Sequence, residues 1–313
     1  MINVTHFSDP GCPFAYSASP SITALRWRYG DQLRWRHVMI GLTEDAEQYA
    51  RRGYTTLRSA RNQRRFRPFG MPFAHAPKQR LSATAPACRA VVAVRLTQPE
   101  LEWAAFRGLQ FAQFTTALPL ESEEALRDGL RRVAGIDVDA ILAMIDSPEV
   151  TEAYEADRAE ARTAAGSPTE FQGKAENTDG LVRYTAPSLI FERDGRRLEA
   201  GGFQQFDAYD VCVANLDPSL SRRGAPDDLS ELLAAFPEGV TAAEVAACIA
   251  PMTDLADPEA AELALLELAD DGRAVVAPVG DGALWLSADS PFADVLAGRE
   301  VRLGEPLPPA VPA

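Results

Sequence analysis

The order of apolar and polar residues at the start of the chain predicts a strand, a helix and a second strand. Ile2–Ser8 alternates apolar and polar side chains and contains β-branched residues, which is typical of a short strand. A turn at residues 9–11 follows, and a helix begins near Pro13 and continues past Pro20, where proline is expected to kink it. Leu33–Ile40 alternates again. The pattern predicts a β-α-β unit with a turn and a cysteine at the start of its helix.

Residues 44–165 show helical rather than strand periodicity. Four segments repeat apolar residues at helical spacing, and a fifth combines a polar face with residues of high helix propensity. The segments are Ala87–Leu96, Leu101–Phe114, Ser122–Val133, Val138–Ile145 and Glu152–Ala165. We interpret 44–165 as a helical insertion.

Strand character returns at Leu181–Glu192. The turn Arg193–Arg196 contains an Asp-Gly pair and predicts a hairpin, and Phe206–Asn215 predicts a closing helix. Pro187 interrupts an otherwise regular strand pattern. Because proline cannot donate to a strand ladder, we expect it at the first residue of a strand, at an edge or at a bulge. Residues 1–219 therefore predict one α/β domain.

The composition changes after residue 226. Thr241–Glu244 has the form of a capping box that opens a helix, and Pro258–Ala269 predicts a second helix. Arg273–Pro278 and Ala283–Leu286 flank a Gly-Asp-Gly turn and predict a hairpin. Two helices followed by a two-stranded wing suggest a small winged-helix-like domain at 227–313.

The net charge of −14 is distributed unevenly. Residues 51–80 contain nine Lys or Arg residues and no acid, whereas Asp227–Ser290 contains fourteen acids and one base. The basic segment is either an anion-binding patch or a solvated loop that pairs with acids elsewhere. The acidity of the chain as a whole, and of 227–290 in particular, argues against a nucleic-acid partner.

The sequence predicts a cytoplasmic protein that does not contact a membrane. The first residues lack the basic start and apolar core of a signal peptide, and no run approaches the ~18 apolar residues that a membrane span needs. In that compartment thiols are kept reduced.

The four cysteines are widely separated and include no Cys-x-x-Cys pair. With three histidines in the chain, no spacing of a metal site is present, and we expect no metal. Cys88, Cys212 and Cys248 lie in apolar, helix-like segments and are interpreted as structural thiols.

Cys12 differs because it follows a strand and a turn and stands at the start of a helix. Unpaired backbone N–H groups and the positive end of the helix dipole stabilise an anion at that place. Pro13 suits the first helical position, where its missing N–H is not needed. We therefore expect Cys12 to have a lowered pKa and to react faster than the other three cysteines. The alternative is a cysteine that caps a helix without any reactivity.

The segment Ser8–Tyr16 resembles the active-site segment of DsbA-like thioredoxin-fold proteins, which usually reads Asp-Pro-x-Cys-Pro-x-Cys-Tyr. The resemblance extends to Thr185–Ile190, which is similar to the cis-proline loop of that family, to the helical insertion and to Gly201–Gln204. It covers about residues 1–216. It implies a thioredoxin fold with a helical insertion, a cis peptide bond between Ala186 and Pro187, and Cys12 as the catalytic residue beside that loop.

The active-site motif departs from the family at Ala15, which occupies the position of the second cysteine. A dithiol cycle needs a resolving thiol to expel a mixed disulfide, so the usual formation of disulfides in client proteins is in doubt. The sequence Pro13, Phe14, Ala15, Tyr16 is instead similar to kappa-class glutathione transferases and 2-hydroxychromene-2-carboxylate isomerases, which carry a serine before the proline. That similarity implies a low-molecular-weight thiol, glutathione or an equivalent, as the cofactor.

The segment Ser167–Tyr184 is longer than a simple link before a cis-proline strand. Long irregular loops in compact domains are often functional, so Lys174, Arg183 and Tyr184 are candidates for contact with a thiol or substrate. An exposed loop without a role is the alternative.

Three functions remain open at this point. The first is a monothiol oxidoreductase, in which Cys12 attacks a disulfide and a small thiol completes the turnover. The second is a thiol-dependent transferase or isomerase acting on an electrophilic small molecule. The third is a non-enzymatic thioredoxin-fold scaffold, in which the acidic C-terminal domain packs on the rest of the chain or forms a homodimer.

Overall fold

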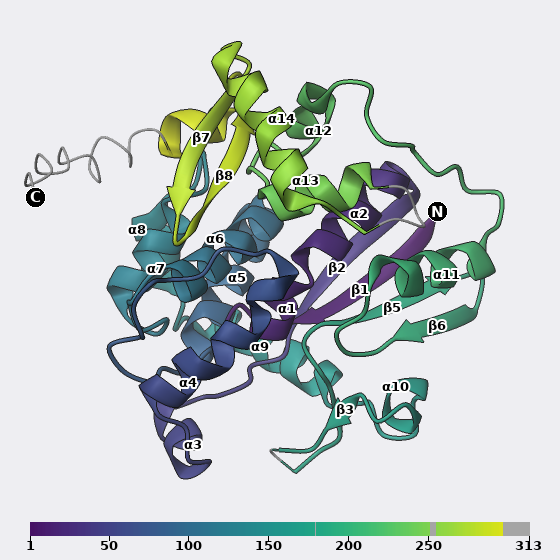
Figure 1. Cartoon of the computed structure of the whole chain (residues 1–313). Coiled ribbons are helices and arrows are strands. Elements are labelled where there is room, and N and C mark those ends of the chain that lie inside the picture. The colour runs from purple at the N-terminus through teal and green to yellow at the C-terminus, as the bar shows by residue number, and fades with distance from the viewer. Residues whose placement is uncertain (179, 251–254, 297–313) are drawn as a thin grey trace, which may run out of the picture.

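The computed structural model describes residues 1–178, 180–250 and 255–296. Its four-stranded sheet has the order β2-β1-β5-β6 (Figure 1). The strands are β1 (Ile2–Ser8), β2 (Leu33–Met39), β5 (Ser188–Arg193) and β6 (Arg196–Ala200). β2 is parallel to β1, whereas β5 is antiparallel to β1 and β6 is antiparallel to β5. β1 and β2 coincide with the segments in which alternation predicts strands, whereas β5 covers only the last part of the strand predicted at Leu181–Glu192.

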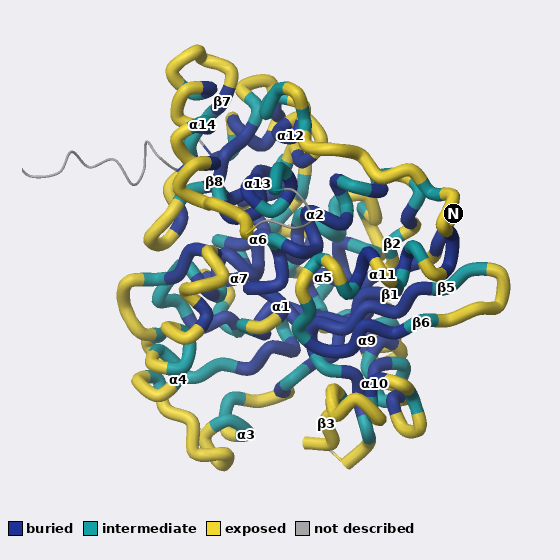
Figure 2. The backbone as a smooth tube through the Cα atoms, turned by 45° about the vertical axis from the view of Figure 1, so that its right-hand side comes forward, coloured by how far each residue is buried: buried dark blue, intermediate teal, exposed yellow. Residues whose placement is uncertain are grey.

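Helices cover both faces of this sheet. They include α2 (Ser19–Tyr29) and α11 (Phe206–Leu216) on one face and α9 (Pro148–Ala161) on the other. On the first face, Ile22 and Val213 are buried together with Val4 of β1. On the second face, Ala161 at the end of α9 is buried with Phe7. Figure 2 shows the central strands as a continuous buried band, so the end of β1 is held rigidly on both sides.

The helix after β1 is interrupted, as the sequence predicts. α1 (Pro13–Ser17) ends at Ala18, and α2 begins at the next residue with Pro20 in its first turn. A proline is tolerated there because the first N–H groups of a helix have no partner within the helix.

The segment 44–165 contains helices and no strand. Its helices are α3 (Ala46–Arg51), α4 (Thr56–Gln63), η2 (Arg64–Phe69), α5 (Ala85–Thr97), η3 (Pro99–Leu101), α6 (Glu102–Thr115), α7 (Glu123–Leu130), α8 (Val138–Met144) and α9. A further short helix, η1 (Gly30–Gln32), precedes β2. Apolar periodicity does not mark α3 or α4, because neither helix has a fully buried residue.

The segment 167–184 differs from the long irregular loop that the sequence suggests. Ser167 accepts a hydrogen bond from the backbone N–H of Glu170 and caps α10 (Pro168–Phe171). β3 (Ala175–Glu176) then pairs with β4 (Arg183–Tyr184) in an antiparallel hairpin. β4 lies within the strand predicted at Leu181–Glu192, whereas β3 has only two residues and is too short to show alternation.

The C-terminal segment forms helices and a hairpin in the predicted order, with one further helix before them. Its elements are α12 (Leu229–Ala235), α13 (Ala242–Ile249), α14 (Pro258–Asp270), β7 (Ala274–Val279) and β8 (Gly282–Ser287). The capping box at Thr241 and Glu244 is present at the start of α13. The predicted domain continues to residue 313, and its part at 297–313 lies outside the described residues.

This segment shares buried cores with the rest of the chain. Leu284 and Phe292 are buried in one core with Phe111 of the insertion, and Val245 is buried in another with Trp27 of α2. Figure 1 shows the C-terminal elements lying across α2 and α6. Over the three described ranges, no helix combines the length and the apolar character that crossing a membrane requires.

A buried ion pair joins the C-terminal segment to the insertion. Arg107 of α6 contacts both carboxylate oxygens of Glu244, at 2.5 and 3.0 Å, and both side chains are almost fully buried. Thr23 of α2 donates a hydrogen bond to the same carboxylate at 2.9 Å. Burial acts to raise the pKa of Glu244, but Arg107 outweighs it and holds that pKa below its usual range. One carboxylate thus connects α2, α6 and α13.

We predict that Glu244→Gln lowers the free energy of unfolding by about 3–5 kcal/mol, because removing one partner leaves the Arg107 charge buried without compensation. Urea unfolding followed by circular dichroism measures the change. The matched control is Glu259→Gln in the first turn of α14, where the side chain is exposed. Equal stability of the two variants would contradict the proposed importance of the pair.

Candidate active site

Cys12 lies at the junction of β1 and α1. Its backbone N–H donates to the carbonyl of Asp9 at 3.1 Å, and its own carbonyl accepts from the N–H of Tyr16 at 3.0 Å. Cys12 is therefore the residue that caps α1, in an extended conformation. The short turn fixes its side chain relative to the end of the sheet.

The sulfur of Cys12 faces the loop before β5. Its thiol donates a hydrogen bond to the carbonyl oxygen of Ala186 at 3.1 Å, and the peptide bond between Ala186 and Pro187 is cis. The residue is only 6% exposed. The structure thus brings together two segments that are 174 residues apart in the sequence.

The pKa of Cys12 is raised to about 12, mainly by burial, whereas the sequence analysis expects a lowered value. The backbone N–H groups of Ala15 and Phe14 and the charge of Arg183 lower this pKa, and the charge of Asp9 raises it further. The donors predicted for the start of a helix are therefore present, but burial outweighs them. The resting thiol is protonated.

The side chain of Asp9 is hydrogen-bonded to the turn, and no pattern in the sequence marks this role. Its buried carboxylate accepts hydrogen bonds from the N–H groups of Gly11 and Leu42 and from the hydroxyl of Thr84, at 2.7, 2.8 and 2.8 Å. Burial raises its pKa, while these donors lower it. Gly11 has no room for a side chain, because a Cβ there would overlap the methyl group of Thr84.

The other residues of the motif have distinct environments. Ala15 and Tyr16 are buried, and the hydroxyl of Tyr16 donates to the carbonyl of Pro72 at 2.7 Å. Phe14, which follows Pro13, is 51% exposed. Its ring packs edge to face against the ring of Phe66, with 4.7 Å between the ring centroids. Ala15 and Tyr16 therefore support the helix, whereas Phe14 is accessible to a ligand.

The three candidate residues from the segment 167–184 have different environments in the structure. Arg183 is buried, and its charge acts on Cys12. The ring of Tyr184 belongs to the same buried cluster as Cys12, but its hydroxyl bonds to Glu199 and Arg197. Lys174 is exposed, and none of the described contacts brings its ammonium group to Cys12.

The remaining cysteines are free thiols. Cys88 and Cys248 are buried, as expected, whereas Cys212 is partly exposed, which corrects the prediction for that residue. Burial raises the pKa of all three, to about 11 for Cys212. Cys88 lies near the turn, since its thiol approaches Asp9 at 3.4 Å. Across the described ranges, no cluster of His, Cys, Asp or Glu could hold a metal ion.

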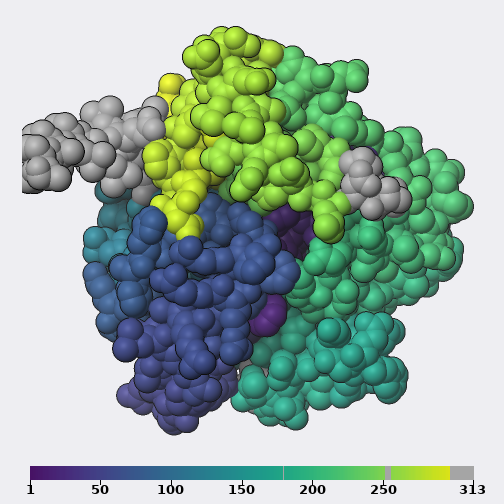
Figure 3. Space-filling model, viewed as in Figure 1, coloured from purple at the N-terminus to yellow at the C-terminus, as the bar shows by residue number. Residues whose placement is uncertain are grey.

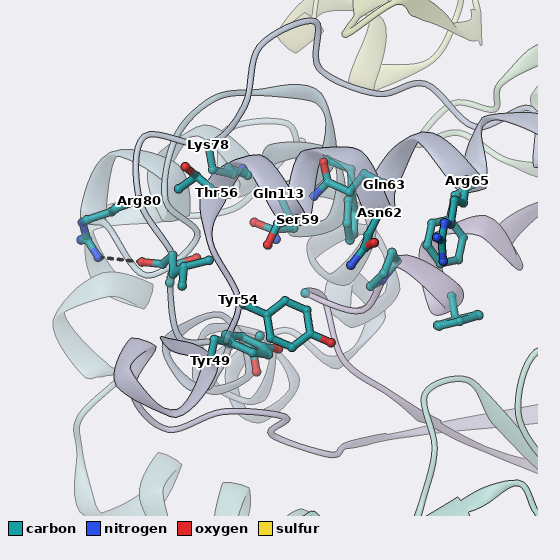
Figure 4. A pocket seen from close by; sticks show the side chains of 18 of the residues that line it. Tyr49, Tyr54, Thr56, Ser59, Asn62, Gln63, Arg65, Lys78, Arg80 and Gln113 are labelled. Atoms are coloured by element: carbon teal, nitrogen blue, oxygen red, sulfur yellow. Dashed lines mark hydrogen bonds between the residues drawn. The ribbon is translucent and has the colours of Figure 1, made fainter. Parts of the chain in front are cut away.

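A cavity of about 540 Å³ opens beside the turn. Gly11, Pro13 and Phe14 form part of its lining, and the rest comes from the helical insertion. Figure 4 shows Tyr49 and Tyr54 on one side of the open space and Ser59 and Gln113 on the other. In Figure 3, atoms of the N-terminal segment reach the surface between the insertion and the segment that follows it. The basic segment 51–80 had suggested an anion-binding patch but not a cavity.

The model of the DSBA-like thioredoxin domain matches residues 3–184, which is more than half of the chain. The chain belongs to the DSBA-like thioredoxin family. The match ends just before Ala186 and Pro187, so the loop that faces Cys12 is placed by the structure rather than by the family model.

Solved structures agree with this fold. A probable DsbA oxidoreductase from Streptomyces coelicolor is 15% identical, with 72% of this chain and 94% of that chain covered and a TM-score of 0.53. A protein from Nitrosomonas europaea, provisionally described as a disulfide isomerase, is 18% identical. The match covers 68% of this chain and 96% of that chain, with a TM-score of 0.50. The cytosolic disulfide reductase DsbM from Pseudomonas aeruginosa, in a structure with GSH, is 18% identical. The match covers 68% of this chain and 98% of that chain, with a TM-score of 0.47. No curated protein sequence matches the chain.

We predict that the alkylation rate of Cys12 rises about tenfold per pH unit from pH 7 to pH 10 without a plateau. Below a pKa of about 12, the reactive thiolate fraction increases tenfold with each pH unit. Iodoacetamide labelling followed by peptide mass spectrometry measures the rate at each cysteine, and free glutathione is the reference thiol. A plateau below pH 8 would instead indicate the activated cysteine that the sequence predicts.

Proposed function

We propose that the protein is a thiol–disulfide oxidoreductase that acts through one cysteine, Cys12, together with a small thiol such as glutathione. The observation that carries the proposal is the contact of the Cys12 sulfur with Ala186, in the loop of the cis peptide bond. The position of Ala15 supports a monothiol cycle, because that buried alanine supplies no second thiol within the motif.

The proposed cycle exchanges one disulfide for another. The Cys12 thiolate attacks one sulfur of a substrate disulfide, a mixed disulfide with Cys12 forms, and the other substrate sulfur leaves as a thiolate and takes up a proton. A small thiolate then attacks the substrate sulfur of the mixed disulfide and forms a new disulfide with it, and Cys12 is released as a thiolate. In the net exchange the substrate sulfur that left first is reduced, and the small thiol is oxidised.

The cycle begins from a protonated thiol, since burial raises the pKa of Cys12 to about 12. The N–H groups of Ala15 and Phe14 and the charge of Arg183 oppose this effect. They are the groups that we expect to stabilise the thiolate as the substrate displaces the hydrogen bond to Ala186. We propose that this reaction takes place in the reducing environment of the cytoplasm.

A thiol-dependent transferase or isomerase is the second candidate. The cavity beside Pro13 and Phe14 favours it, because about 540 Å³ is within the range of sites that enclose a small organic molecule. In that case Cys12 would orient a bound thiol rather than form a lasting disulfide.

For the C-terminal segment we propose a winged-helix-like unit that supports the rest of the chain and binds no nucleic acid. Val240 forms a bridge to Trp285 in β8, so a short strand-like pairing joins the hairpin before α13 begins. The fourteen acids and single base of Asp227–Ser290 would repel phosphate groups. Its buried contacts with α2 and α6 give it a structural role.

Incubation with oxidised glutathione tests the monothiol cycle. We predict that the native protein gains one stable glutathione adduct, at Cys12, because no neighbouring thiol removes it. We expect Ala15→Cys to lose the adduct and form an internal disulfide, since the new thiol restores a Cys-x-x-Cys pair. Intact mass and peptide mapping distinguish the two products.

Two further variants are the controls. Cys12→Ser should gain no adduct, whereas Cys212→Ser, which alters another partly accessible thiol, should behave like the native protein. A disulfide between Cys12 and Cys88, or an adduct at Cys212 alone, would refute the monothiol proposal.

A further inference from the structure

One wall of the cavity is formed by α4, and its composition is unusual. A helix that packs on a protein core normally turns apolar residues inward. α4 instead contributes Thr56, Ser59, Asn62 and Gln63 to the lining of the cavity, which are uncharged polar residues at helical spacing. Its arginines, including Arg61, are exposed. The inward face of α4 is therefore suited to hydrogen bonding rather than to core packing.

These four side chains are partly buried, and in the part of the chain that the structure describes none of them makes a hydrogen bond to protein. Gln113 also lines the cavity, beside Ser59, and its buried side-chain oxygen has no hydrogen-bond partner among the described residues. The polar atoms of the four α4 side chains stay accessible in the cavity, and a ligand that displaced water from them without replacing its hydrogen bonds would lose free energy. A ligand for this wall must carry several hydrogen-bonding groups.

Aromatic rings contribute to the remaining walls. Tyr49 and Tyr54 line the side opposite Ser59 (Figure 4). Phe14 and Phe66 also belong to the lining. The guanidinium group of Arg58 lies over the ring of Tyr54, at 5.4 Å from its centroid. Aromatic rings bind flat, unsaturated molecules well, because such surfaces stack or meet edge to face.

Lys78 supplies a cationic group to the same cavity. It is one of only two lysines in a chain with thirty-one basic residues. Its ammonium group donates to the carbonyls of Ala112 and Leu118, at 3.3 and 2.6 Å, and takes part in none of the ion pairs among the described residues. Burial lowers its pKa to about 7. An acidic oxygen of a ligand would stabilise the charged form.

We propose that this cavity binds a planar aromatic molecule that carries several hydroxyl or carbonyl groups, a polyphenol. The polar groups of the ligand pair with the inward face of α4, its rings lie among the tyrosines and phenylalanines, and its most acidic oxygen meets Lys78. The proposal does not depend on disulfide exchange at Cys12.

Isothermal titration calorimetry with quercetin as the probe tests this site. The titration is carried out with the full chain, without thiol or disulfide, and with a mild detergent that prevents ligand aggregates. Unsubstituted flavone is the matched ligand, because it keeps the ring system and lacks the hydroxyl groups. We expect quercetin to bind at least about tenfold more tightly than flavone, since each lost hydrogen bond weakens binding.

Paired variants locate the site on the protein. Asn62→Leu on the inward face should weaken quercetin binding about tenfold, while Arg61→Leu on the exposed face of the same helix should not. Lys78→Met should weaken binding, while Lys174→Met, at the other lysine, should not. Circular dichroism establishes that each variant is folded, and the Asn62 pair still tests the site if Lys78→Met is unstable.

Three outcomes would overturn the proposal: no binding of quercetin up to about 1 mM, equal affinity for quercetin and flavone, or equal loss in both members of the Asn62 and Arg61 pair. Because no disulfide chemistry is measured, these outcomes leave the proposed thiol exchange untouched. Conversely, failure of glutathione to modify Cys12 would not affect this binding test.

Discussion

The buried carboxylate of Asp9 is the group on which the active-site turn depends. It accepts hydrogen bonds from the turn at Gly11, from Leu42 after β2 and from Thr84 before α5. No ion pair in the described ranges includes Asp9, so these donors and the more distant thiol of Cys88 stabilise it. A buried carboxylate that loses its partners is strongly destabilising. The turn, the end of the sheet and the insertion are therefore fixed relative to one another by one side chain.

The same carboxylate affects the acidity of Cys12. Burial is the main cause of the raised pKa, and the negative charge of Asp9 adds to it. The interaction acts in both directions, because a thiolate at Cys12 would in turn disfavour the ionised form of Asp9. The arrangement that aims the sulfur at Ala186 thus also keeps it protonated. For the proposed reaction the Cys12 sulfur must face Ala186 and must also be ionised. The resting structure meets the first requirement but not the second.

Features that depend on neighbouring residues could be predicted from the sequence. The strands at Ile2–Ser8 and Leu33–Met39, the interruption at Pro20 and the capping box at Thr241 all follow from local pattern. The acidity of Cys12 could not be predicted, because it depends on burial produced by distant segments. The same holds for the pairing of Arg107 with Glu244 and for the inward face of α4. The scarcity of lysine was visible in the sequence and could have drawn attention to Lys78.

The C-terminal hairpin contacts the insertion just after α4, the helix with the polar inward face. A helix that turns polar residues toward a cavity gains little from apolar packing, so its position must be held by its neighbours. Asp281, in the turn between β7 and β8, pairs with Arg67 at 2.7 Å and accepts from the N–H of Phe73 at 2.6 Å, while its own N–H donates to the carbonyl of Phe73 at 3.0 Å. These contacts fix the chain that directly follows α4. The hairpin thereby helps to hold α4, which forms one wall of the cavity.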